Sequence, residues 1–222
     1  YSQIRNNRSW GNLREVYEKN KFIYEEHLNI FIDLTKPVEE LWKEVNSKRK
    51  NTIRRADKEG TSFAVKNNED SLKRCYMILK EVYDRAKLPL PSYDFFLNLL
   101  LLEKNSRLLI FCAIHEEKII GCMLAFAYKN TIYDFYAGSM KKFYNKYPND
   151  LIPWQVFKWG KTNGFKVFNF GGAGKPNIPY GVREYKKKFG GSLVNHGRFQ
   201  KTHQPLLFKI SKIGFKLYQK IK

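Results

Sequence analysis

The sequence predicts a mixed α+β fold, and two observations about the order of its segments support that prediction. Helical periodicity marks residues 12–20, 35–60, 70–87, 92–102 and 148–163. Apolar and aromatic runs of strand length mark residues 28–34, 62–66, 108–115, 119–128, 131–137, 166–170 and about 192–199. Three of these strands follow one another directly, as in a meander. Helices and strands therefore do not alternate regularly, as they would in a βαβ protein.

Helix boundaries follow from residues that start and stop helices. Pro37 suits a first helical position, and Gly60 suits a C-cap, so we expect one long helix over 35–60. Ser92 follows a Leu-Pro-Leu-Pro break and caps the next helix. Pro148 opens another helix, which ends at Asn163-Gly164.

Composition excludes several classes of protein. The 222 residues include 41 Lys+Arg against 21 Asp+Glu, a net charge of +20, together with 17 Phe, 14 Tyr and 4 Trp. That many aromatic side chains need a core, which excludes a disordered basic tail. The charge predicts an anionic partner, such as nucleic acid, a phosphate-rich substrate or a membrane surface.

The cysteines and histidines predict neither a disulfide framework nor a metal site. Cys112 and Cys122 lie in apolar runs and are expected to be buried thiols of a reducing compartment. The four histidines are scattered without ligand spacing. No apolar run is long enough to span a membrane.

The positive charge is concentrated in two segments. Residues 41–58 carry seven basic and two acidic side chains, and residues 183–222 carry eleven and one. These segments supply +15 of the +20, which predicts a binding track rather than a uniformly basic surface.

The first basic segment places one cation on its apolar side. On a helical wheel, Arg49 falls among the apolar residues, so it either forms an internal salt bridge or binds an anion. Four of the other six cations share a stripe, either solvated or facing a row of phosphates: Lys43, Lys50, Arg54 and Lys58.

The second basic segment begins with three consecutive lysines, Lys186–Lys188, of which at least one must turn inward. Its end, residues 206–222, has the pattern of a basic amphipathic helix. Such a helix either packs on the domain or contacts an anionic surface such as lipid or RNA.

No catalytic motif stands out by itself. Residues 171–174 are glycine-rich and follow a strand, but they lack the spacing of a dinucleotide-binding loop. Tyr133, Asp134 and Tyr136 lie along one strand, either as core alternation or as the wall of a cleft. By themselves the residues indicate a basic α+β domain that binds an anionic ligand.

Three segments taken together resemble a known family. Residues 32–60, 136–172 and 180–191 resemble the FemABX aminoacyltransferases, the peptidoglycan interpeptide-bridge enzymes, which have a GNAT-like fold. The resemblance covers roughly residues 20–200 and implies a mixed central sheet flanked by helices. It implies that residues 1–34 end a preceding GNAT-like half, 35–203 form the second half, and 204–222 form a basic C-terminal helix.

The resemblance also implies an activity. The family transfers an amino acid from aminoacyl-tRNA to the stem-peptide amine of a UDP- or lipid-linked muropeptide precursor. Neither a metal nor a further cofactor is required, because the aminoacyl-tRNA is itself a substrate. The implied location is the cytoplasm, with possible peripheral contact at the inner face of an anionic membrane.

By resemblance, Lys186 stabilises charge at the reacting ester or tRNA terminus, and Tyr136 lies at the precursor cleft; both are expected to be catalytic. Further substrate or tRNA contacts are expected from Arg49, Lys50, Arg54, Arg55, Arg183, Tyr185, Lys187 and Lys188. Asn169 stands where the family often has aspartate, and no residue is identified as the base.

Two other functions are compatible with the sequence. One is a GNAT N-acyltransferase that uses acetyl-CoA. Residues 140–147, MKKFYNKY, lack the glycines of the usual pyrophosphate-binding loop, so we rank this function below aminoacyl transfer. The other is a basic module that binds RNA or membrane without catalysis.

Overall fold

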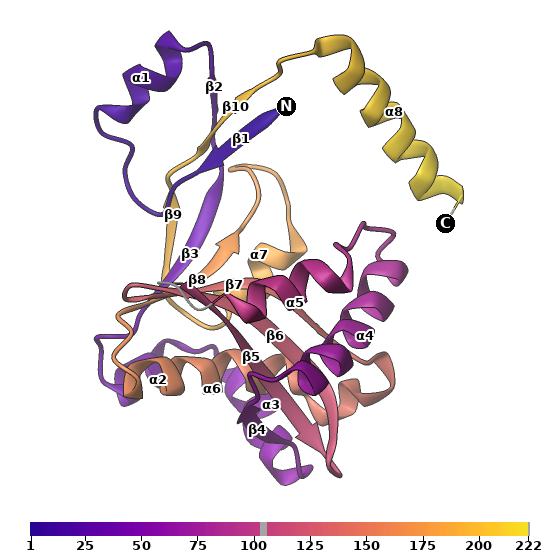
Figure 1. Ribbon diagram of the computed structural model, residues 1–222. Helices are drawn as coiled ribbons and strands as arrows, with labels where there is room; N and C mark the ends of the chain where they lie inside the picture. The colour runs from indigo at the N-terminus through magenta and orange to yellow at the C-terminus, as the bar shows by residue number, and fades with distance from the viewer. Residues whose placement is uncertain (103–105, 222) are drawn as a thin grey trace.

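The computed structural model describes residues 1–102 and 106–221, and a mixed sheet forms its centre (Figure 1). The strands of this sheet are β3 (Leu28–Asp33), β4 (Ser62–Val65), β5 (Ser106–His115), β6 (Lys118–Tyr128), β7 (Thr131–Ser139), β8 (Val167–Gly172) and β9 (Ser192–Asn195). Their order is β4-β5-β6-β7-β8-β3-β9. Neighbours are antiparallel except β7 and β8, which are parallel. The predicted α+β class and the meander are confirmed.

Helices cover both faces of this sheet (Figure 1). The helices of the domain are α2 (Val38–Glu44), α3 (Ser47–Lys58), α4 (Glu69–Arg85), α5 (Tyr93–Leu101), the 3-10 helix η1 (Lys141–Lys146), α6 (Pro148–Thr162) and α7 (Gly181–Lys187). A further helix, α8 (Pro205–Ile221), follows at the end of the described chain and does not cover the sheet. Leu109 and Phe111 of β5 belong to a core shared with α3 and α6. Leu108 and Ile110 belong to a second core, shared with α4 and α5. Both faces are buried, so these strands read as continuous apolar runs.

A small second sheet joins the start of the chain to a segment near its end. Strands β1 (Ser2–Arg5) and β2 (Ile23–Glu25) both pair with β10 (Arg198–Lys201), and helix α1 (Leu13–Lys19) packs beside them. Phe199 of β10 is buried against Trp10 and Tyr17. The sequence predicted neither β1 nor β2, and its single strand near 192–199 is two strands, β9 and β10.

The single helix expected over residues 35–60 is wrong, because the chain breaks between α2 and α3. Val45 is extended, with φ −66° and ψ 132°, and Asn46 follows with ψ 142°. The Asn46 side chain accepts a hydrogen bond from the Lys48 amide at 3.0 Å. Asparagine is a strong N-cap, so it restarts a helix here rather than continuing one.

Helix α8 projects from the domain with its apolar side exposed (Figure 1). Leu206 is 72% exposed, and Ile210 is 56% exposed. The helix does contact the domain: Phe208 stacks on Tyr1 with ring centroids 4.6 Å apart, and Gln219 donates to a main-chain carbonyl. Of the two alternatives left by the sequence, packing on the domain is present only through these few contacts, and most of the apolar side stays exposed. Among the described residues, no helix has the length and apolar character needed to cross a membrane.

The two basic segments do not form one continuous track. Helix α3 lies at the bottom of Figure 1, whereas α8 lies at the top. The end of α7 adjoins the start of α3, because the Asn46 amide donates to the Lys188 carbonyl at 2.9 Å. The expected single track is thus limited to α3 and α7.

Candidate active site

The central feature of the site is a fork between the two parallel strands. β7 and β8 pair only from Thr131–Val167 to Tyr133–Asn169, and beyond this point they separate. In β7 a bulge inserts Phe135, because Leu124 pairs with Tyr136 while Ala125 pairs with Asp134. Main-chain groups past the last pair are therefore released from the ladder and border an opening.

Glycines allow β8 to bend away at the fork. Gly171 has φ +72°, and a Cβ there would come within 3.3 Å of the Tyr133 hydroxyl. A Cβ on Gly172 would lie 2.8 Å from Nε2 of His27. The glycine-rich turn noted in the sequence thus serves close packing at positive φ.

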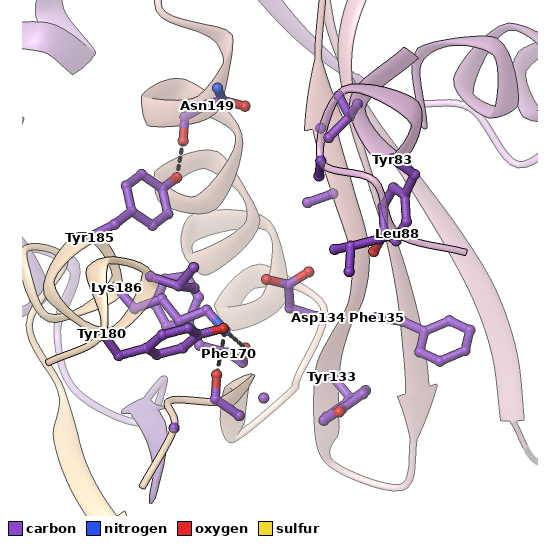
Figure 2. A pocket seen from close by; sticks show the side chains of 18 of the residues that line it. Tyr83, Leu88, Tyr133, Asp134, Phe135, Asn149, Phe170, Tyr180, Tyr185 and Lys186 are labelled. Atoms are coloured by element: carbon purple, nitrogen blue, oxygen red, sulfur yellow. Dashed lines mark hydrogen bonds between the residues drawn. The ribbon is translucent and has the colours of Figure 1, made fainter. Parts of the chain in front are cut away.

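The fork opens into a cleft of about 810 Å³. Its walls come from β7 and β8, the C-terminal end of α4, and α7 (Figure 2). The lining includes Tyr83, Tyr133, Asp134, Ser139, Tyr144, Asn149, Phe170, Gly172, Tyr180, Tyr185 and Lys186. A cleft of this volume is in the range that holds small-molecule ligands.

Lys186 reaches into the fork from α7 (Figure 2). Its ammonium donates to the Phe170 carbonyl at 2.6 Å and to the Gly172 carbonyl at 2.9 Å. Burial lowers the pKa of Lys186, and the nearby Asp134 carboxylate opposes that effect. An ammonium has three N–H donors, and the structure uses two of them here. The third is therefore available to a ligand.

The neighbouring lysines behave differently. Lys187 and Lys188 are exposed, and Lys187 lies 3.7 Å from Glu184. The prediction that at least one of the three consecutive lysines turns inward is confirmed by Lys186.

Tyr185 lines the cleft and is anchored from behind. Its hydroxyl donates to the Asn149 carbonyl at 2.5 Å, and burial raises its pKa. The Arg49 guanidinium lies 4.8 Å from the Tyr185 ring centre and forms an ion pair with Asp150. Of the two interpretations of Arg49, the internal salt bridge is the one present. A substrate contact would require that pair to open.

The remaining predicted cations lie outside the cleft lining. Arg54 stacks over Trp42 at 5.4 Å, and Arg55 over Tyr147 at 4.9 Å. The Lys50 ammonium donates to a main-chain carbonyl of α2 at 3.2 Å. All three residues belong to α3, so they can serve only a ligand that extends beyond the cleft.

Arg183 holds the loop that follows β8. Its guanidinium donates to the carbonyls of Ala173 at 3.2 Å, Lys175 at 2.7 Å and Ile178 at 2.5 Å. These bonds give Arg183 a role in positioning the loop. The prediction of a direct substrate contact stays a prediction.

Tyr136 is not part of the cleft lining, contrary to its expected place. Its ring packs 5.0 Å from Phe96 and 5.5 Å from Tyr83, within the core beneath α4 and α5. The bulge at Phe135 breaks the strand alternation, so Tyr136 does not share a side with Asp134. Tyr133 and Tyr83 line the cleft instead.

Several cleft residues were not assigned a role from the sequence. Asp134 is the first residue beyond the last β7–β8 pair, and burial raises its pKa to about 6. His27 has a buried Nδ1 without a hydrogen-bond partner among the described residues, and burial lowers its pKa to about 4. The sequence offered one signal for Asp134, because aspartate is rare within β-strands and this one lies in a strand rich in aromatic residues.

Asn169 has a structural task. It is fully buried, its amide nitrogen donates to Asn7 at 2.9 Å, and its amide oxygen accepts from the Gly171 amide at 2.7 Å. Both ends of the side chain thus hold the bend of β8.

The predicted burial of Cys112 and Cys122 is confirmed, and Cys75 is buried as well. Within residues 1–102 and 106–221, no group of three or more His, Cys, Asp or Glu residues is placed to hold a metal ion.

Residues 47–187, which contain the fork and the inward lysine, match the acetyltransferase (GNAT) domain family. The chain belongs to this family. GNAT proteins are acyltransferases, so the expected enzyme class is supported at that level. No curated protein matches the GNAT chain in sequence.

Solved structures share the fold. FemX has a TM-score of 0.71 at 14% identity, over 90% of this chain and 71% of its own. L-PGS from Bacillus licheniformis has a TM-score of 0.66 at 17% sequence identity, and the match covers 93% of this chain and 70% of the L-PGS chain. The C-terminal domain of a putative lysylphosphatidylglycerol synthetase from Agrobacterium fabrum has a TM-score of 0.64 at 12% sequence identity. That match covers 85% of this chain and 65% of the other. The likeness to FemX confirms the fold that the FemABX resemblance implied.

Proposed function

We propose that this GNAT protein transfers an amino acid from aminoacyl-tRNA to the stem-peptide amine of a peptidoglycan precursor, with the reacting ester held in the fork. The observation that carries the proposal is the Lys186 ammonium, fixed by two carbonyls with its third donor uncommitted. The fold shared with FemX agrees with it.

The proposed chemistry needs a donor at the carbonyl oxygen. When the amine attacks the ester, negative charge develops on that oxygen, and a preorganised N–H stabilises it. Lys186 is already held in place, so little reorganisation is needed as the charge forms. Loss of one such donor typically slows turnover about 10²-fold or more.

The loop after β7 supports a donor other than coenzyme A. Residues 140–147 form η1 and its flanks and contain no glycine, and Tyr147 precedes Pro148 at the start of α6. A pyrophosphate site at a helix start relies on free main-chain N–H groups. Proline supplies none at its position.

A tRNA extends far beyond an 810 Å³ cleft, so it needs an outer contact surface. Lys187 and Lys188 are exposed next to Lys186, and the start of α3 adjoins Lys188 through the hydrogen bond from the Asn46 amide. We propose that α7 and α3 together contact the tRNA backbone. The acceptor would be made in the cytoplasm or presented at the inner face of the membrane.

The test supplies each donor with each acceptor. The full chain is incubated with charged tRNA or acetyl-CoA, together with UDP-linked muropentapeptide or vesicles containing phosphatidylglycerol, and product masses are measured. An amino acid added to the muropeptide supports the proposal. An amino acid added only to phosphatidylglycerol would show that the acceptor is a lipid, as the name of the synthetase neighbour suggests for that protein. No product from any pair, with salt-sensitive RNA binding retained, would favour a non-enzymatic module.

Acetyl transfer from acetyl-CoA is the second candidate, because the matching family is named for acetyltransferases. An acetyl group on an amine acceptor, with no aminoacyl product, would replace the proposal.

A further inference from the structure

Asp134 lies at the point where the fork begins. Tyr133 makes the last pair between β7 and β8, and Asp134 is the next residue. The bulge that turns Tyr136 into the core leaves Asp134 on the cleft side. Figure 2 shows its carboxylate pointing into the cleft toward Lys186, which comes from the opposite wall.

The Asp134 carboxylate has no committed partner. In the part of the chain that the structure describes, it makes neither a hydrogen bond nor an ion pair, although Lys186 is near enough to act on it electrostatically. The residue is partly buried, and a carboxylate withdrawn from water without a partner costs stability. A structural role would be expected to satisfy it, as Asn169 is satisfied nearby.

The groups that face Asp134 are mostly neutral. Tyr83 approaches from α4, Tyr185 and Lys186 from α7, and Tyr144 of η1 lines the same cleft. Burial raises the pKa of Tyr83 and Tyr185, and the Asp134 charge adds to that effect. Arg5 and His27 also line the cleft, but Lys186 is the cation that acts on the Asp134 carboxylate, and it is already bound to two carbonyls.

We propose that Asp134 is the catalytic proton acceptor for the attacking amine. The inference rests on the proposed transfer to an amine. Lys186 and Asp134 would divide the work: the ammonium faces the carbonyl oxygen, and the carboxylate faces the nucleophilic nitrogen.

The step balances as follows. The acceptor ammonium gives one proton to Asp134, and the freed amine forms a C–N bond to the ester carbonyl carbon. The bond from that carbon to the ribose oxygen then breaks. The second proton on nitrogen goes to the ribose oxygen, and Asp134 releases its proton to solvent. The products are an amide, a free tRNA hydroxyl and one proton.

The environment gives Asp134 a suitable proton affinity. Burial raises its pKa to about 6, so it is mostly ionised at neutral pH yet accepts a proton more readily than an ordinary aspartate. An exposed aspartate would be a weaker base by about 2 pKa units.

The test compares two nucleophiles in single-turnover reactions of the full chain with aminoacyl-tRNA. The muropeptide amine must lose a proton before it attacks, whereas hydroxylamine is largely neutral at pH 7. Rates above the background of free aminoacyl-tRNA are measured for wild type, Asp134→Asn, Asp134→Glu and Lys186→Ala. Asp57→Asn, on the exposed side of α3, is the matched control.

Asp134→Asn should slow transfer to the muropeptide about 10²-fold or more while changing the hydroxylamine reaction only a few-fold. The wild-type transfer rate should rise with pH near pH 6, where Asp134 ionises, and the Asp134→Asn rate should not. Asp134→Glu should retain part of the activity, and Lys186→Ala should lose both reactions. Near-normal amine transfer by Asp134→Asn, or an equal loss of both reactions, would overturn this inference alone. A wild type that acylates no amine would overturn the proposed function and this inference with it.

Discussion

At the scale of single residues, the cleft keeps two groups in states that cost stability. Lys186 is partly buried and donates to two carbonyl oxygens, whereas Asp134 has no hydrogen-bond or ion-pair partner among the described residues. Titratable groups perturbed by desolvation and a specific charge partner in a cleft are typical of functional sites. The stability of the free protein should therefore report on Asp134.

Asp134→Asn should stabilise the free protein at neutral pH. The folded pKa is about 6 against an ordinary 3.8, so the wild type loses stability as pH rises through this interval. The free energy of unfolding of the variant should exceed that of the wild type by about 1–3 kcal/mol at pH 7, and the two should be equal below about pH 4. Urea unfolding at several pH values measures this. Equal stability of the two proteins at all pH values would show that the carboxylate is well solvated.

The sequence identified the inward lysine but not its counterpart. Three consecutive lysines predict that at least one turns inward, and the family resemblance singled out Lys186 among them. Asp134 and Tyr136 could not be sorted correctly, because the bulge at Phe135 depends on pairing with β6. Strand periodicity alone does not reveal such an insertion.

At the scale of elements, the fork depends on how β8 bends. Most strands and helices around it were predictable from apolar runs and caps, but α7 and η1 were not among them. Asn46 is a strong N-cap and signals the break between α2 and α3, whereas Pro37 and Gly60 favour one continuous helix. The short strands β1 and β2 were not predictable, because they are defined by pairing with β10, nearly 200 residues away.

Replacement of Gly171 by alanine should damage both stability and transfer. The residue has φ +72°, and a Cβ would crowd the Tyr133 hydroxyl at 3.3 Å. We expect Gly171→Ala to cost about 1–2 kcal/mol of unfolding free energy and to reduce transfer more than tRNA binding. Gly181→Ala is the control, since nothing lies within 4 Å of a Cβ there and its φ is not positive. The same cost at both positions would argue against a strained bend in β8.

At the scale of the whole molecule, most of the +20 charge lies in two separate groups of cations. The cations of α7 adjoin those of α3, whereas α8 lies at the opposite end (Figure 1). Only the first group is close to the fork. A tRNA whose aminoacyl end occupies the fork should therefore depend on α7 and α3 more than on α8. Peripheral contact of α8 with an anionic membrane stays a prediction.

The salt dependence of tRNA binding tests this division. Lys187→Ser/Lys188→Ser should weaken binding and lower the slope of log Kd against log salt by about 1.5, because two phosphate contacts are lost. Lys212→Ser/Lys216→Ser on α8 removes the same charge and should have a smaller effect. Filter binding at several salt concentrations measures both. An equal or larger effect of the α8 pair would place the tRNA along the other end of the molecule.

The most direct test of the central claim compares two adjacent lysines. Lys186→Ala and Lys187→Ala remove the same charge, but only the first removes the donor in the fork. Single-turnover transfer from aminoacyl-tRNA and the Kd for tRNA are measured for both folded variants. We predict that Lys186→Ala slows transfer about 10²-fold or more with little change in Kd, while Lys187→Ala keeps its transfer rate. Equal losses of transfer and affinity in Lys186→Ala would show that this lysine only binds tRNA, and would contradict its role at the reacting ester.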